Sequence, residues 1–99
     1  MDELSREERK ALVERSIQAR EHADQLQEEA RALERRYQKA ERDRETPAAL
    51  RVLATQVAEA FMEASRAAAE AAFVTRDVVE AMPMGITVGE WVEGEIKRN

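Results

Sequence analysis

The sequence contains no cysteine and only three glycines, two prolines and four aromatic side chains. Without cysteine it can form neither disulfides nor thiolate sites, which is consistent with a reducing compartment. With so few glycines and prolines, helices can run for long distances without interruption. The remaining composition, 43% hydrophobic and 37% charged, is typical of a helical bundle or coiled coil. We therefore expect one all-α domain over residues 1–99 and no sheet.

Long apolar runs are also missing. No stretch approaches the roughly 18 uninterrupted apolar residues that a membrane-spanning helix needs. Because the chain is charged from its second residue, we expect neither a signal peptide nor a membrane anchor, and we predict a cytoplasmic protein. The formal net charge of −5 argues against general binding to duplex nucleic acid, because phosphate contacts need a positive surface.

The residue combinations that usually carry catalysis are absent as well. His22 is the only histidine, and Ala19 stands three residues before it, which excludes the Glu-x-x-His pattern of helical di-metal sites. The sequence shows no nucleophile with a base, no glycine-rich phosphate loop and no Cys/His cluster. We predict no enzymatic activity, no cofactor, no metal site and no small-molecule substrate.

Two long helices are predicted from their start signals. Ser5 and Glu8 form a capping box, so the first helix should run over about residues 5–44. Thr46 and Pro47 are suited to the cap and first turn of a second helix over about residues 47–82. The short connection favours an antiparallel hairpin, and the alternative is one long kinked helix that opens outward in an oligomer.

A short third helix is predicted over about residues 88–98. Thr87 and Glu90 form a second capping box after the break at Pro83. Trp91 should lie on its buried face together with Val88, Val92 and Ile96. The alternative for this segment is a β-strand. In the hairpin, we expect the third helix to meet the start of the first helix and the end of the second.

Each long helix carries an apolar seam. The first seam steps by three and four residues, which is a heptad period. It comprises Leu12, Ser16, Ala19, Ala23, Leu26, Ala30, Leu33, Tyr37 and Ala40. The main seam predicted for the second helix comprises Leu50, Leu53, Val57, Phe61, Ala64, Ala68, Ala71, Val74, Val78 and Met82.

The second helix has more apolar surface than one neighbour can cover, because its charges fall on one narrow stripe. Phe73 lies on that stripe, where either the C-terminal segment covers it or another chain contacts it. We expect two hairpins to pair into a dimeric four-helix-type bundle. The predicted interface for a second copy or another protein comprises Ala60, Ala64, Ala68, Ala71, Phe73 and Trp91.

The leading functional hypothesis is a non-enzymatic, homo-oligomeric protein–protein interaction module, such as a scaffold, adaptor, chaperone or inhibitor of an unidentified protein partner. One alternative is a nucleic-acid-associated regulator that uses a basic ridge on the first helix. That ridge comprises Arg31, Arg35, Lys39 and Arg42. The other alternative is an acidic decoy of nucleic acid, because residues 59–95 contain eight acidic and two basic side chains.

Overall fold

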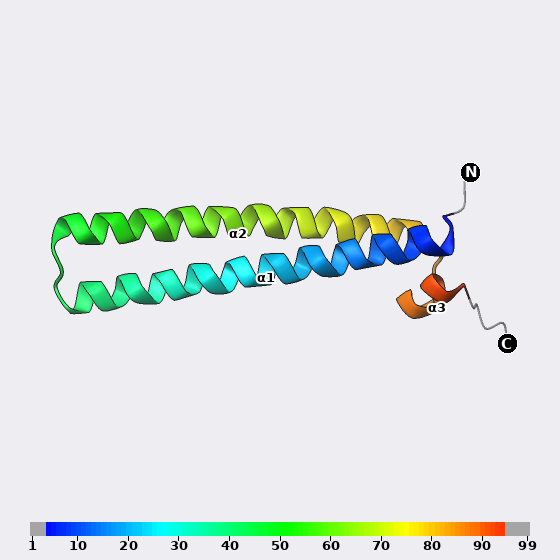
Figure 1. Ribbon diagram of the computed structural model, residues 1–99, viewed down its shortest axis with the longest axis horizontal. Helices are drawn as coiled ribbons and strands as arrows, with labels where there is room; N and C mark the ends of the chain where they lie inside the picture. Colours follow the sequence, from blue (N-terminus) through cyan, green and yellow to red (C-terminus); the bar gives the residue numbers. More distant parts are fainter. Residues whose placement is uncertain (1–3, 95–99) are drawn as a thin grey trace.

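The computed structural model describes residues 4–94, which form a long helical hairpin with a short third helix (Figure 1). The elements are α1 (Arg6–Arg42), α2 (Pro47–Ala81) and α3 (Val88–Glu93). The hairpin measures 66 × 25 × 19 Å, with the α1–α2 loop at one end and α3 at the other. The predicted all-helical hairpin with a short third helix is confirmed over these residues.

The predicted helix starts are confirmed by their capping hydrogen bonds. The Ser5 hydroxyl accepts from the Glu8 backbone N–H at 3.1 Å, and the Glu8 carboxylate accepts from the Ser5 N–H at 3.2 Å. The Thr46 hydroxyl accepts from the Ala49 N–H at 3.2 Å, with Pro47 in the first turn of α2. The same reciprocal pair joins Thr87 and Glu90 at the start of α3.

The helices end earlier than predicted. α1 ends at Arg42 and α2 at Ala81, each within two residues of the expected position. α3 ends at Glu93 because Gly94 adopts a left-handed conformation with φ of 76°, which terminates a helix. The predicted continuation is therefore wrong at residue 94, and residues 95–98 lie outside the described part of the chain.

The seam of α1 is the predicted one. Ser16, Ala23, Ala30 and Ala40 are buried, and the intervening seam residues are half-buried. The Ser16 and Thr75 hydroxyl oxygens lie 3.0 Å apart across the two helices, which defines their antiparallel register. Among the described residues no large side chain is fully buried, so the core is thin.

The seam of α2 differs from the predicted one in its middle. Ala67 is buried at 7% exposure and Ala60 is half-buried, whereas Ala68 is exposed. The seam that α1 covers steps by alternating three and four residues, which keeps it aligned with a straight neighbour. The predicted seam contained two consecutive steps of four, and these drift around the helix. The covered seam comprises Leu50, Leu53, Val57, Ala60, Ala64, Ala67, Ala71, Val74 and Val78.

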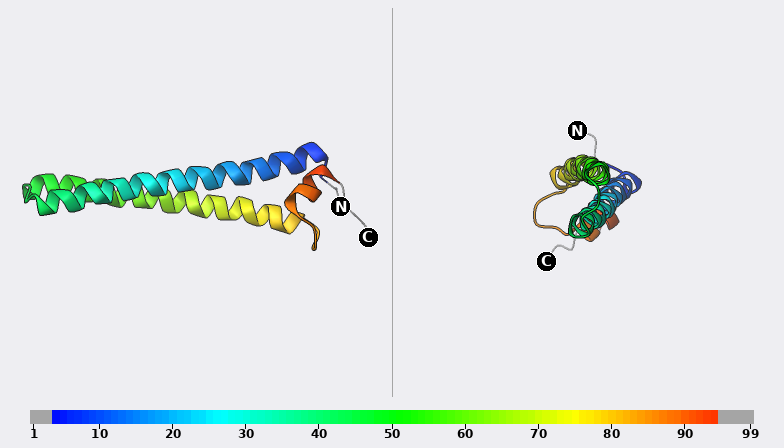
Figure 2. Two further views of the ribbon diagram at one scale, coloured as in Figure 1. Left: turned by 90° about the horizontal axis from the view of Figure 1, so that it is seen from below. Right: turned by 90° about the vertical axis from the view of Figure 1, so that its left-hand side faces the viewer.

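α3 docks on its own chain, against the N-terminal part of α1 (Figure 2). The predicted contact with the start of α1 is confirmed, whereas the predicted contact with the end of α2 is wrong, because among the described residues α3 packs against α1 alone. Trp91 is buried at 7% exposure, and the Arg6 guanidinium lies 2.8 Å from the Glu93 carboxylate. Val88 was expected on the buried face but is 42% exposed. Val92 is half-buried as expected. Ile96, which was also predicted to lie on this buried face, lies outside the described residues.

The hairpin exposes more surface than a compact protein of its mass. Its accessible surface is 7861 Å², whereas a compact monomer of 11.3 kDa exposes about 5,700 Å². Its radius of gyration is 20.3 Å, against about 13 Å for a compact chain of this length. The fold thus leaves a large surface available for contact with another molecule.

Candidate interaction surface

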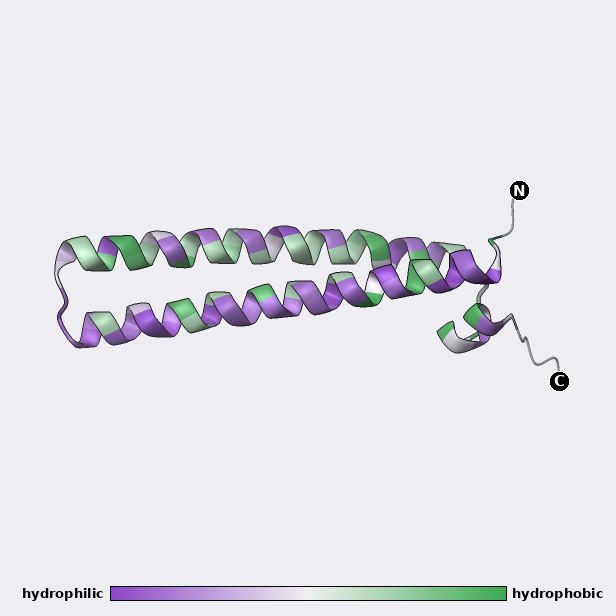
Figure 3. Cartoon of the chain, viewed as in Figure 1, coloured by the Kyte–Doolittle hydropathy of each residue, from purple (hydrophilic) through white to green (hydrophobic). Residues whose placement is uncertain are grey.

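α2 carries a second apolar seam that α1 leaves mostly uncovered, with only Thr75 of this seam hydrogen-bonded to α1 through Ser16. Like the covered seam, it alternates steps of three and four residues, over about four heptads, and it contains no charged side chain. We call it the free seam. Six of its nine residues are exposed, and Phe61, Thr75 and Met82 are half-buried. It comprises Ala54, Ala58, Phe61, Ser65, Ala68, Ala72, Thr75, Val79 and Met82. Figure 3 shows that α2 is the more hydrophobic of the two long helices.

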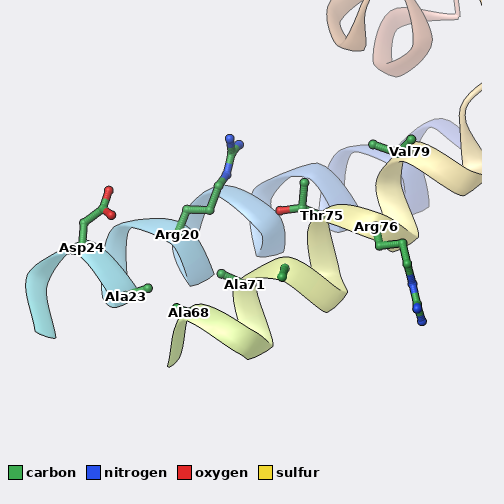
Figure 4. A pocket seen from close by; sticks show the side chains of 9 residues that line it. Arg20, Ala23, Asp24, Ala68, Ala71, Thr75, Arg76 and Val79 are labelled. Atoms are coloured by element: carbon green, nitrogen blue, oxygen red, sulfur yellow. The ribbon is translucent and has the colours of Figure 1, made fainter. Parts of the chain in front are cut away.

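A shallow groove of about 620 Å³ runs along the free seam where α2 meets α1. Its α2 side is formed by three alanines and by Thr75, Arg76 and Val79, with Val79 toward α3 (Figure 4). Its α1 side carries Arg20 and Asp24, one turn apart, beside Ala23. The floor of the groove is therefore apolar and its rim is charged, as in the centre and edge of a protein interface.

Large apolar side chains are exposed on α2. Val79, in the free seam, is 64% exposed, and Met62, next to the seam, is 56% exposed. Phe73 is 59% exposed, and the Arg76 guanidinium carbon lies 5.2 Å from its ring centroid, within the range of a cation–π contact. The expectation that the C-terminal segment covers Phe73 is wrong for the residues through Gly94.

The predicted interface residues divide into two groups. Ala64, Ala71 and Trp91 are buried within the chain, at 1%, 5% and 7% exposure. They stabilise the hairpin and the docking of α3, so they are not accessible to another molecule. Ala60 is half-buried beneath α1, whereas Ala68 and Phe73 are exposed.

Sequence reasoning missed most of the free seam. The predicted main seam contained only three of the nine free-seam residues, Phe61, Ala68 and Met82, and the other six were not assigned to it. The alternating steps of three and four residues could have revealed the free seam, because two heptad seams on one helix predict two neighbouring helices.

The predicted basic ridge is exposed along α1 toward the hairpin loop. All four of its residues are exposed, and Arg35 lies 3.3 Å from the Glu28 carboxylate. This pair is well solvated, so it contributes little to stability. Residues 31–51 contain seven basic and four acidic side chains, whereas residues 77–93 contain four acidic side chains and no lysine or arginine. Residues 4–14, which include the start of α1 and lie at the same end as α3, add three basic and three acidic side chains, so the α3 end is negative and the loop end is positive.

Within residues 4–94, no three acidic or histidine side chains lie close enough together to hold a metal ion. The second groove, of about 410 Å³, lies on the other flank of the hairpin and is lined by Glu29, Arg36, Glu59 and Glu63 among others. Neither long helix contains an apolar stretch sufficient to cross a membrane over the described range.

Comparisons with protein-family models, with curated proteins and with solved structures found no match to this chain.

Proposed function

We propose that this protein is a non-enzymatic helical interaction module that acts as a homo-oligomer, with the free seam of α2 as its principal contact surface. The observation that carries the proposal is an uncharged seam of heptad period left exposed on a helix whose other seam is already covered. A seam of this length normally packs against another helix.

The surplus surface supports the same function. The chain exposes roughly 2,000 Å² more than a compact monomer of its mass, and a stable protein interface buries about 600–1,000 Å² on each partner. The alanines of the free seam allow a partner helix to approach closely, and the exposed Met62 extends the contact at its side. A scaffold, adaptor, chaperone or inhibitor would use such a surface to bind a further protein.

Size-exclusion chromatography with light scattering tests the proposal. The wild-type protein should elute as a dimer or a larger oligomer at micromolar concentration. Ala68→Glu should raise the dissociation constant at least about a hundredfold, because burying an unpaired carboxylate costs several kcal/mol. Its helicity should not change, because Ala68 is exposed in the protomer.

Ala32→Glu is the matched control, since Ala32 is exposed on α1 away from both seams of α2. It should leave the oligomer intact. A wild-type protein that remains monomeric up to about 100 μM, where weak specific complexes already form, would refute the proposed function.

A second candidate function, binding of nucleic acid, is supported by the exposure of the whole basic ridge. It predicts gel retardation of a DNA or RNA duplex at low salt that disappears steeply as salt rises. A charge-neutralised ridge should abolish this retardation, and no retardation by the wild-type protein would exclude it.

A further inference from the structure

Small and large side chains are arranged along the free seam in an order that favours one relative orientation of two paired helices. Building on the proposed function, we infer that the occupant of the free seam is a second copy of α2, running antiparallel about a twofold axis between Ser65 and Ala68. The two protomers then present the same surface to each other, as expected for a closed dimer.

The sizes along the seam match in this arrangement. With the twofold axis placed there, Ser65 packs against Ala68 of the partner and Phe61 against Ala72. Further out, Ala58 meets Thr75 and Ala54 meets Val79. Every layer pairs a small side chain with a small one or with a single larger one. The space between two helices 8–10 Å apart can therefore be filled evenly.

A parallel arrangement fills the same space unevenly. It places Phe61 against Phe61 and Val79 against Val79, with the layer at Ala68 containing only two methyl groups between them. The helices would have to separate at the phenylalanines, which would leave voids at the alanines, and both changes are destabilising.

The distribution of charge favours the antiparallel arrangement independently. The loop end of the hairpin, residues 31–51, has three more basic than acidic side chains. At the α3 end, residues 77–93 have four acidic side chains and no basic one, and residues 4–14, at the start of α1, have three of each, so that end is negative. Figure 1 shows these segments at opposite ends of the rod. An antiparallel dimer sets the basic end of each protomer alongside the acidic end of the other, whereas a parallel dimer sets like charges together.

Single-cysteine variants test the orientation directly, because the chain has no native cysteine. Ala54→Cys and Val79→Cys change exposed residues of the protomer and should not disturb the hairpin. We expect a short bismaleimide to cross-link a mixture of the two variants and to give no dimer with either variant alone. Identical cysteines lie about 37 Å apart in the antiparallel dimer, from 25 residues at about 1.5 Å each.

Ala32→Cys, on the exposed side of α1, is the control for random collision and should give no cross-linked dimer. Cross-linking of each seam variant with itself, in the absence of the other variant, would overturn the antiparallel dimer and leave the proposed function standing. A protein that is monomeric by light scattering would refute both the antiparallel dimer and the proposed function. A dimer that cross-links in neither way would overturn the use of the free seam by a second copy.

Discussion

At the scale of single residues, alanine determines how the two long helices pack. Ala23, Ala67 and Ala71 form the central buried cluster, with Ala19 and Leu26 at its edge. Such small side chains allow the helix backbones to approach closely, so the contact depends on having no extra volume at these positions. Adjacent alanines on the same helices are exposed. The role of each alanine is therefore decided by its position around the helix.

Ala30 and Ala32 provide a matched test of this packing. Ala30 is fully buried and Ala32 is exposed on the same helix. Ala30→Leu should lower the free energy of unfolding by about 1–3 kcal/mol, because the larger side chain must separate the helices. Ala32→Leu should change it by less than about 0.5 kcal/mol. Urea unfolding followed by circular dichroism measures both, and equal effects would show that the helices are not closely packed at Ala30.

At the scale of secondary-structure elements, α1 and α2 differ in what they leave exposed. α1 has one apolar seam, and α2 covers it. α2 has two, and only one is covered. This asymmetry was predictable in part, because the charges of α2 were seen to fall on one narrow stripe. That Phe61 and Ala68 belong to the free seam rather than to the covered one was not predictable, because both seams contain residues of similar size.

α3 has only six residues, too few to be stable in isolation. It depends on docking, and Trp91 supplies the buried surface, whereas the Arg6–Glu93 ion pair is more than half exposed. Trp91→Ala should therefore release α3 and cost up to about 3–5 kcal/mol. Glu93→Gln should cost less than about 1 kcal/mol. Thermal unfolding compares the two, and a larger loss for Glu93→Gln would mean that the ion pair, rather than the indole, holds α3.

At the scale of the whole molecule, the hairpin is a rod with little interior. Its stability in isolation should be low, because few large side chains leave water on folding. Association would add the burial that the protomer lacks, and the opposite charges at its two ends would orient the partner.

Because association would stabilise the folded hairpin, the midpoint of its thermal unfolding should depend on protein concentration. Because a partner that binds only the folded state stabilises it by mass action, the wild-type midpoint should rise by about 5 °C or more for a hundredfold increase in protein concentration. Ala68→Glu should abolish the rise, and Ala32→Glu should preserve it. Differential scanning calorimetry at two concentrations makes the measurement. A wild-type midpoint independent of concentration would indicate that the hairpin is stable without a partner.

The starts of the three helices, the hairpin connection and the seam of α1 could be deduced from the chain alone. Caps and heptad spacing are local features, and their geometry depends on residues three or four positions apart. Two results depended on the packing of distant segments: which of two adjacent seams on α2 meets α1, and where the indole of Trp91 is buried. Both are choices between apolar surfaces of similar composition, and only the juxtaposition of helices in space distinguishes between them.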